Sequence, residues 1–279
     1  ARQSSDSPRT HTSNDTFYRN TCECLSRTDH NAPPNERMNF GLFHSSLDLL
    51  LFSLTSPLKQ TRPFFCRGFG SPDRLNNLHR LRRDRRAQLE LLHNEPDVHW
   101  TDTSSSNSMR SLSPLLGSSG ARVQQLRFES PVAHLLPPES RHAEFLLVTP
   151  IDNTSVSAVT TLMPPTADFT YAARLRFLGV PLLKRNVASL IPMIPFYADR
   201  KPAEQFRACL ATVCDLFALG AGVVSETSGV QNVLARRGLF SHFGVSGYSL
   251  GGYLAAQFAC ISDRDMACVP IVLPRSAAS

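Results

Sequence analysis

Residues 243–260 read FGVSGYSLGGYLAAQFAC, and within them Gly247, Ser249 and Gly251 form the pattern G-x-S-x-G. This pattern is typical of a nucleophile elbow, a sharp turn from a buried strand into a helix with a serine hydroxyl at its apex. Glycines suit such a turn because a side chain two residues before or after the serine would collide with the turning backbone. The stretch predicts Ser249 as a nucleophile and Gly247, Gly251 and Gly252 as the glycines of the elbow.

The residues on both sides of the motif have the pattern of a parallel β-α-β unit. Apolar residues at 239–245 predict a buried strand, small and apolar residues at 252–258 predict a helix packed on it, and 267–273 predict the next strand. In that context the backbone N–H of Leu250 would point toward the oxygen that becomes negative during acyl transfer. An ordinary strand-to-helix turn whose serine only caps the helix is the alternative interpretation.

The composition limits the classes of protein to consider. With 279 residues, 42% of them hydrophobic, the chain can bury one substantial core, which excludes a protein disordered throughout. The net charge of +6 suits an anionic surface or substrate, but no motif or aromatic platform for nucleic acid accompanies it. The seven cysteines show no spacing typical of a zinc site or a disulfide scaffold, so we interpret them as mostly reduced core thiols. We expect no metal, no cofactor and no nucleic acid.

Local composition divides the chain into four predicted parts. Residues 1–45 are polar and predict a disordered N-terminal extension, and 46–100 predict a helical segment. Its apolar run LDLLLFSL, at 47–54, is far shorter than the roughly 20 residues that span a bilayer, so we expect no transmembrane segment. The Ser-rich stretch at 101–122 predicts a flexible insertion, and 123–279 predicts a partial α/β hydrolase-type domain.

The helical segment carries a basic surface. Ser71 is a predicted N-cap and Pro72 a predicted first residue of a helix. Leucines recur at helical spacing, and six arginines occupy the rest of the helix and its continuation, at 74, 80, 82, 83, 85 and 86. A solvated charged face explains this pattern, and contact with phospholipid headgroups is the alternative.

The centre of the chain alternates between strand and helix patterns. Apolar runs predict strands at 123–128, 143–148, 156–163 and 188–195. A basic amphipathic helix is predicted over 174–185, before the last of these strands. After that strand, Pro202 opens a predicted helix with Phe217 on its inward face, and a second helix ends at Arg236, with Gly238 as its stop. This alternation predicts an α/β fold with a mostly parallel sheet and helices on both faces.

Several separated motifs occur together in a specific order. They are FFCRGFGSPDRL (64–75), FESPVAHLLPPES (128–140), PTADFTY (165–171), RLRFLGVPLLKRNVASLIPMIPFYADRKP (174–202), DLFALGAGVVSE (215–226), GVSGYSLGGYLAA (244–256) and VPIVLPRSAAS (269–279). This succession resembles the alpha/beta hydrolase domain-containing protein 18 family. The resemblance covers about residue 47 to the end, with 101–122 as an insertion.

The resemblance implies a serine hydrolase that acts on an ester or a lipid acyl group, at membranes or in mitochondria. It implies Ser249 as the nucleophile, and Leu250, Thr166 and Ala167 as the oxyanion region. One departure concerns the loop before Thr166. The family typically reads His-Leu-Ala-Gly there and continues Thr-Gly-Asp, whereas this chain has Leu-Met-Pro-Pro and continues Thr-Ala-Asp. Pro165 has no N–H to donate, which puts the second half of the oxyanion hole in doubt.

A second departure concerns the catalytic base. In this fold the triad runs Ser, then Asp or Glu, then His, but none of the nine histidines follows Ser249. His134 and His242, which precede it, are interpreted as structural. We therefore expect an incomplete α/β hydrolase fold that is inactive as given, because the acid and the His lie beyond the chain end. The alternative is a non-catalytic lipid-binding or protein-interaction module that keeps the elbow as architecture. The sequence does not indicate the oligomeric state.

Overall fold

The computed structural model describes residues 65–102, 121–151 and 156–271 of the chain. Outside these ranges lie the predicted disordered extension at 1–45, the apolar run at 47–54 and nearly all of the Ser-rich insertion. The boundaries between the four predicted parts therefore stay predictions.

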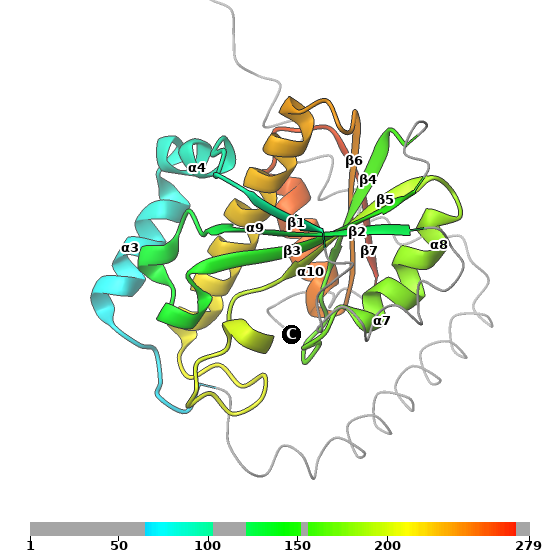
Figure 1. The fold of residues 1–279 in the computed structure, drawn as a ribbon. Helices are drawn as coiled ribbons and strands as arrows, with labels where there is room; N and C mark the ends of the chain where they lie inside the picture. Colours follow the sequence, from blue (N-terminus) through cyan, green and yellow to red (C-terminus); the bar gives the residue numbers. More distant parts are fainter. Residues whose placement is uncertain (1–64, 103–120, 152–155, 272–279) are drawn as a thin grey trace, which may run out of the picture. The chain divides into compact units, whose positions relative to one another are not determined.

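A seven-stranded sheet forms the centre of the fold (Figure 1). Its strands are β1 (His99–Asp102), β2 (Ala121–Glu129), β3 (His142–Pro150), β4 (Ala158–Met163), β5 (Val187–Met193), β6 (His242–Tyr248) and β7 (Met266–Ile271). In space they follow the order β1-β2-β3-β5-β4-β6-β7. Pairing is antiparallel from β1 to β5 and parallel from β5 to β7. The sheet is therefore mixed, and its parallel half carries the Gly-rich motif.

The order of the parallel strands creates a switch point in the sheet. From β4 the chain crosses to β5 on one side, and from β5 it crosses past β4 to β6 on the other side. At such a point the carboxyl ends of the strands leave a crevice, where open α/β sheets bind their ligands. In the pairing of β4 with β6, Met163 stands opposite Gly247. The two loops that follow these strands therefore begin side by side.

The strands predicted from apolar runs correspond to β2 through β7. The central strand β5 shows why continuous apolar runs predict strands in this chain, because every residue of β5 after Val187 is buried. A strand covered on both faces has no polar side, so it reads as continuous apolar sequence rather than as an alternation.

Helices cover both faces of the sheet, as predicted. One face carries α7 (Ala172–Arg174), the π-helical turn η5 (Leu175–Gly179) and α8 (Val180–Leu183). The other carries α3 (Pro72–Arg83), α4 (Arg85–Leu92), α9 (Val213–Arg236) and α10 (Leu250–Ile261), as Figure 1 shows. Within the described ranges, the connections contain the 3-10 turns η2 (Ala133–Leu135), η3 (Pro138–Ser140) and η6 (Ala198–Arg200).

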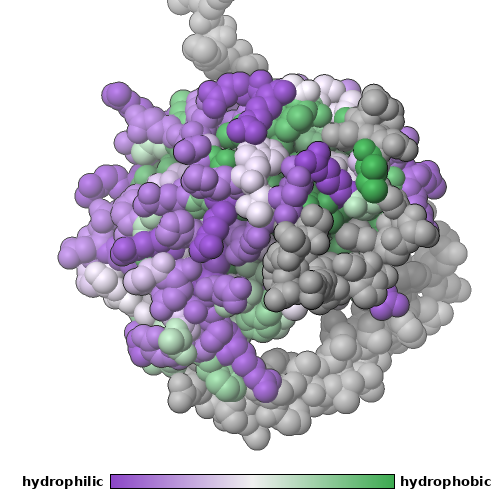
Figure 2. All heavy atoms as spheres, in the orientation of Figure 1, coloured by the Kyte–Doolittle hydropathy of each residue, from purple (hydrophilic) through white to green (hydrophobic). Residues whose placement is uncertain are grey.

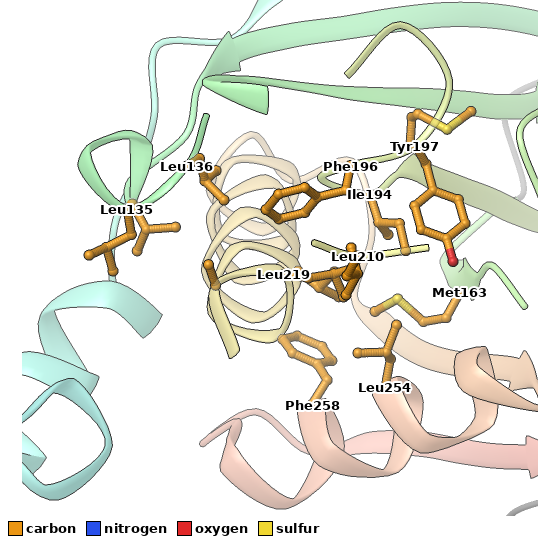
Figure 3. Packing of buried hydrophobic residues seen from close by; sticks show 14 of the residues in the cluster. Leu135, Leu136, Met163, Ile194, Phe196, Tyr197, Leu210, Leu219, Leu254 and Phe258 are labelled. Carbon is orange, nitrogen blue, oxygen red and sulfur yellow. The ribbon is translucent and has the colours of Figure 1, made fainter. Parts of the chain in front are cut away.

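The largest core cluster lies between α9, α10 and the sheet. In Figure 3, Leu254 and Phe258 of α10 point toward Leu219 of α9 and toward Met163 at the end of β4. Leu254 and Phe258 are almost completely buried, so each contributes about 1.5–3 kcal/mol of burial free energy relative to an exposed side chain. This packing holds the start of α10 against the carboxyl end of β4.

A single helix, α9, replaces the two helices predicted after Pro202. It begins at Val213, where Thr212 and Asp215 form a capping box in which each side chain accepts from the other residue's backbone N–H. Pro202 is a good first residue of a helix, but the local cap at Thr212 decides where this helix begins. The predicted inward position of Phe217 is also wrong, since its side chain is 48% exposed. The predicted end is confirmed, because the helix stops at Arg236 and Gly238 has a φ of +65°.

By length and composition α9 could cross a bilayer, but its burial within the fold accounts for its apolar residues. It has 24 residues, and 78% of its most apolar window is buried within the fold. It also carries Glu226, which is 1% exposed and paired with Arg200 by two hydrogen bonds of 2.7 and 2.9 Å. We therefore interpret α9 as the core helix of the sheet.

Three further predictions need correction. Ser71 stands at the N-cap of α3, but its side chain makes no capping hydrogen bond, although Pro72 is the first helical residue as expected. The basic helix at 174–185 is helical, yet Arg174 is buried rather than exposed. Of the five described cysteines, only Cys214 is buried, so most described thiols are not core residues.

Candidate functional site

Ser249 lies at the junction between β6 and α10, where the chain turns from strand into helix. Its φ of 55° and ψ of −119° are unusual for a residue with a side chain. Its backbone N–H donates to the Ile271 carbonyl at 3.0 Å, and its carbonyl accepts from the Tyr253 N–H at 3.1 Å. The turn is therefore anchored to β7 on one side and to the first turn of α10 on the other.

Close backbone approach explains all three glycines of the turn. A Cβ on Gly247 would lie 2.3 Å from the carbonyl carbon and oxygen of Gly251. A Cβ on Gly251 would lie 2.4 Å from the Met163 carbonyl oxygen, and one on Gly252 would lie 2.8 Å from the Ile271 carbonyl oxygen. Real Cβ atoms essentially never come within 3.0 Å of such atoms. These positions therefore accept only glycine, and Gly251 brings the elbow into contact with the end of β4.

The loop after β4 is the second wall of the site. Pro164 and Pro165 have no N–H, and the N–H of Asp168 donates to the Pro165 carbonyl at 3.3 Å. Thr166 and Ala167, the two residues of this loop that are predicted to belong to the oxyanion region, are both exposed. Ala167 has a φ of 66°, in the left-handed region that favours glycine. Its backbone is hydrogen-bonded to the Tyr197 side chain.

A buried ion pair holds this loop in place. The Asp168 carboxylate accepts from Arg174 Nε at 2.8 Å and from the Thr170 N–H at 3.2 Å. Asp168 is 9% and Arg174 4% exposed, so the pair is shielded from solvent and stronger than a surface pair of the same geometry.

The Arg174 side chain joins three segments of the backbone. Besides Asp168 it donates to the carbonyls of Leu162 at 3.0 Å, Pro192 at 2.6 Å and Thr170 at 3.2 Å. These groups come from the end of β4, the end of β5 and the loop itself. Burial lowers the pKa of the Arg174 guanidinium, while the Asp168 carboxylate opposes that change. Arginine stays charged in proteins, so the pair remains ionic.

Two tyrosines, the buried Tyr197 and the half-buried Tyr171, stand near the same loop. Tyr197, which is 2% exposed, packs against Phe169 with ring centroids 5.4 Å apart, and Figure 3 shows its hydroxyl directed toward Met163. Burial raises the pKa of Tyr197, against a hydrogen bond with the Ala167 backbone. Burial also raises the pKa of Tyr171 far above its ordinary value. Both phenols are therefore neutral at physiological pH.

The sequence did not indicate these supporting residues. Arg174 was predicted only as part of a basic amphipathic helix, and the spacing of Asp168 and Arg174, six residues apart across a turn, has no recognised pattern. A signal was nevertheless present, because the acid lies in the loop after a buried strand and the arginine lies in the helical segment that follows. The geometry brings together Ser249, Leu250 and the elbow glycines with the start of the loop that carries Thr166 and Ala167. Their catalytic roles stay predictions.

The described residues supply no base to Ser249. No hydrogen bond joins its hydroxyl to a described His, Asp or Glu side chain. His242 begins the strand that Ser249 follows, so the strand separates them by about 20 Å. His134 lies exposed in η2. Within the described ranges, no group of three or more His, Cys, Asp or Glu side chains could hold a metal ion.

Solved structures with a similar fold include several esterases. A Bacteroides fragilis protein provisionally assigned as an acetyl xylan esterase is 14% identical, with a TM-score of 0.44, over 75% of this chain and 57% of that protein. Acetyl xylan esterase 1 from Thermoanaerobacterium sp. is 10% identical, with a TM-score of 0.39, over 71% and 57%. A cold-adapted esterase from an Arctic intertidal metagenomic library is 11% identical, with a TM-score of 0.41, over 50% and 56%. The chain thus spans little more than half the length of these proteins.

The family model described as Alpha/beta hydrolase domain containing 18 matches residues 62–279. This range includes the whole described sheet, the elbow and the loop after β4. It also agrees with the order of motifs in the sequence, so the resemblance and the predicted α/β hydrolase-like fold are both confirmed. The chain therefore belongs to the family Alpha/beta hydrolase domain containing 18.

Proposed function

We propose that the chain is a serine hydrolase that cleaves an ester or a lipid acyl group through Ser249 as nucleophile. The observation that carries this proposal is the backbone conformation of Ser249 at the start of α10. Such a conformation costs about 1–3 kcal/mol, and an ordinary N-cap does not need it, because caps adopt extended backbone angles. The Ser249 side chain also makes no capping hydrogen bond. The interpretation as a simple helix cap therefore loses its support.

In the proposed reaction, Ser249 Oγ attacks the carbonyl carbon of the ester while its proton passes to a general base. The electron pair of the carbonyl π bond moves onto the oxygen, which accepts hydrogen bonds from the Leu250 N–H and from the loop after β4. Because the Ala167 backbone already contacts Tyr197, the N–H of Thr166 is the second donor that we propose. Collapse of this intermediate expels the alcohol with the proton from the base and leaves an acyl-serine. Water then releases the acid by the same steps.

The general base is the part of this reaction that the described residues do not contain. A serine without a base stays largely unreactive at neutral pH. We therefore propose that this chain alone is inactive, and that an acid and a histidine in sequence following Ser279 complete the triad in the order usual for this fold.

The membrane and mitochondrial predictions remain part of this proposal. The arginines at 80, 83, 85 and 86 of α3 and α4 are exposed, and such residues attract anionic headgroups with about 1 kcal/mol each near a membrane surface. Peripheral contact of this kind suits an enzyme whose substrate is a lipid.

Labelling with a fluorophosphonate probe tests the proposal. We expect the probe to modify Ser249 in a form of the chain that continues beyond Ser279, and to modify the present chain hardly at all. Ser249→Ala should abolish labelling of the extended form. Ser246→Ala is the matched control, because Ser246 lies in β6 just before the elbow but is 7% exposed and donates to the Val269 carbonyl at 2.8 Å.

Equal labelling of the two forms would show that no downstream base is needed. An extended form with intact fold, a downstream acid and histidine, and no labelling would instead favour the non-catalytic module, in which Pro164 and Pro165 leave the oxyanion hole too weak for catalysis.

A further inference from the structure

A cavity that is partly open to solvent lies among the helices, away from the elbow. It has a volume of about 550 Å³ and is lined by residues of α3, α4, α9 and α10. Small-molecule sites in proteins usually have volumes of about 300–1,000 Å³. Gln257, which lines it, stands eight residues beyond Ser249 along α10, or about 12 Å at the rise of an α-helix. The cavity is therefore not part of the proposed catalytic site, and the inference below does not rest on Ser249.

The walls of the cavity are mainly apolar. They include Leu75 and Leu78 of α3, Leu91 of α4, Phe217 of α9 and Ile261 of α10. Phe217 is 48% exposed although it belongs to a core helix. Large apolar side chains that line a cavity without filling it gain free energy when an apolar ligand covers them.

Small residues of α9 keep the cavity open beside Gln257. A Cβ on Gly220 would approach no atom closer than the Gln257 amide, with Oε1 at 3.7 Å and Nε2 at 3.9 Å. These distances are ordinary van der Waals contact, and Gly220, Ala221 and Gln257 all line the cavity. A Cβ at Gly220 therefore meets no tight contact, and we expect a larger side chain there to extend into the cavity.

Gln257 carries a hydrogen-bond acceptor without a partner. Its Oε1 atom is buried and accepts no hydrogen bond from any described group. A buried polar atom left in this state costs about 1–3 kcal/mol. Its amide presents an acceptor and a donor in one plane, so it matches a ligand group that has both an O–H and a carbonyl. An undissociated carboxyl group has this pattern and forms two parallel hydrogen bonds with a primary amide.

The surface around the cavity carries excess positive charge. Arg80, Arg83 and Arg85 are exposed and have no ion-pair partner among the described residues. The two acids nearest to them in the sequence are engaged, since Asp84 caps α4 and Glu90 pairs with Arg86. Figure 2 shows hydrophilic residues gathered over the side of the molecule where α3 and α4 lie. Such a surface raises the local concentration of an anionic amphiphile.

We propose that this cavity binds a single-chain fatty acid, with its carboxyl group on the Gln257 amide and its hydrocarbon chain between the leucines of α3 and α4. The arginines attract the dissociated acid from solution, and the acid takes up a proton as it leaves water, because burial in apolar surroundings favours the neutral carboxyl. The ligand satisfies the Oε1 atom of Gln257 and covers the exposed face of Phe217.

Titration of the intact chain with dodecanoic acid labelled with carbon-13 at the carboxyl group tests this proposal, by calorimetry and by NMR. We expect saturable binding of one molecule and a carboxyl resonance at the position of the undissociated acid. Gly220→Leu should weaken binding at least about tenfold by filling the cavity. Gln257→Leu should weaken it at least about fivefold and remove the shift of the resonance. Ser249→Ala is the control and should bind like the unsubstituted chain.

The proposal is overturned if the intact chain shows no saturable binding of dodecanoic acid. This includes the case in which another segment of the chain already fills the cavity. Affinity that Gly220→Leu leaves unchanged also overturns it, provided that circular dichroism shows a folded variant. If Gly220→Leu does not fold, Gln257→Leu provides the test. A carboxyl resonance of the bound acid that is unchanged in Gln257→Leu would contradict the placement of the carboxyl group on the Gln257 amide. Loss of binding in Ser249→Ala would place the fatty acid at the elbow instead.

Discussion

The elbow at Ser249 and the loop after β4 meet at the same edge of the sheet, but they are held by different forces. Glycine holds the elbow, because Gly247 and Gly251 let backbone approach backbone where no side chain fits. A charged side chain holds the loop, because Arg174 reaches Asp168 and three carbonyls at once. The elbow therefore depends on the absence of Cβ atoms at its glycines, whereas the loop depends on a buried charged side chain.

This difference predicts how each wall responds to substitution. A steric constraint between backbone atoms has no flexible partner, so an added methyl group must move a strand or a helix. A buried ion pair is a balance between desolvation and attraction, so removal of one partner costs more than removal of both. The elbow should therefore tolerate no change, whereas the loop should tolerate a paired change.

The largest effect is expected at Gly247. Gly247→Ala places a Cβ 2.3 Å from the Gly251 backbone, and we expect it to lower the free energy of unfolding by more than about 4 kcal/mol or to prevent folding. Urea denaturation followed by circular dichroism measures this. Gly244→Ala is the matched control in the same strand, because its nearest neighbour is the Thr160 side chain at 3.1 Å; there we expect about 1 kcal/mol. Equal losses at the two positions would contradict the steric account.

The next effect concerns the ion pair of the loop. Arg174→Met leaves the Asp168 carboxylate buried without its cation, and we expect a loss of about 3–5 kcal/mol in the free energy of unfolding. The double change Arg174→Met with Asp168→Asn removes the uncompensated charge and should recover part of that loss. Urea denaturation of Arg174→Met, of Asp168→Asn and of the double variant measures the coupling between the two side chains.

Arg122→Met is the control for the ion pair. Arg122 also pairs with a carboxylate, that of Asp102 at 2.8 Å, but both side chains are more than half exposed, so we expect no measurable change. A double variant at 168 and 174 that is no more stable than Arg174→Met alone would contradict the role of the buried charge and leave the carbonyl contacts as the explanation.

The comparison also explains which features the sequence could reveal. The elbow was predictable because its geometry demands particular residues at particular spacings, and the buried strands were predictable because burial on both faces leaves continuous apolar runs. The ion pair was not predictable, because a buried arginine and an exposed one look alike until the partner's position is known. The sequence therefore indicated Arg174 only as one of the basic residues of an amphipathic helix.

The helix α9 was predicted wrongly for a related reason. Pro202 has a strong local preference for a helix start, but the capping box of Thr212 and Asp215, joined by Arg74 at 2.7 Å from Asp215, determines the observed start. Arg74 lies 141 residues earlier in the chain. A contact between residues so far apart in the sequence leaves no trace in a local pattern. The start of α9 is therefore set by a tertiary contact that the residues around Pro202 and Thr212 do not reveal.

The smallest effect is expected from glycine substitutions that test for backbone strain at Ser249 in the elbow and at Ala167 in the loop. Ser249 and Ala167 both have positive φ, but Ser249 also has a ψ of −119°, far from the left-handed helical region. Replacement by glycine relieves about 1–3 kcal/mol of strain and costs about 0.4–1 kcal/mol through the more flexible unfolded chain. We therefore expect Ser249→Gly to raise the free energy of unfolding by about 1 kcal/mol and Ala167→Gly to change it by less. Ser249→Ala keeps the strain and should show no gain, so a Ser249→Gly variant less stable than Ser249→Ala in urea would mean that the turn stores no strain for catalysis.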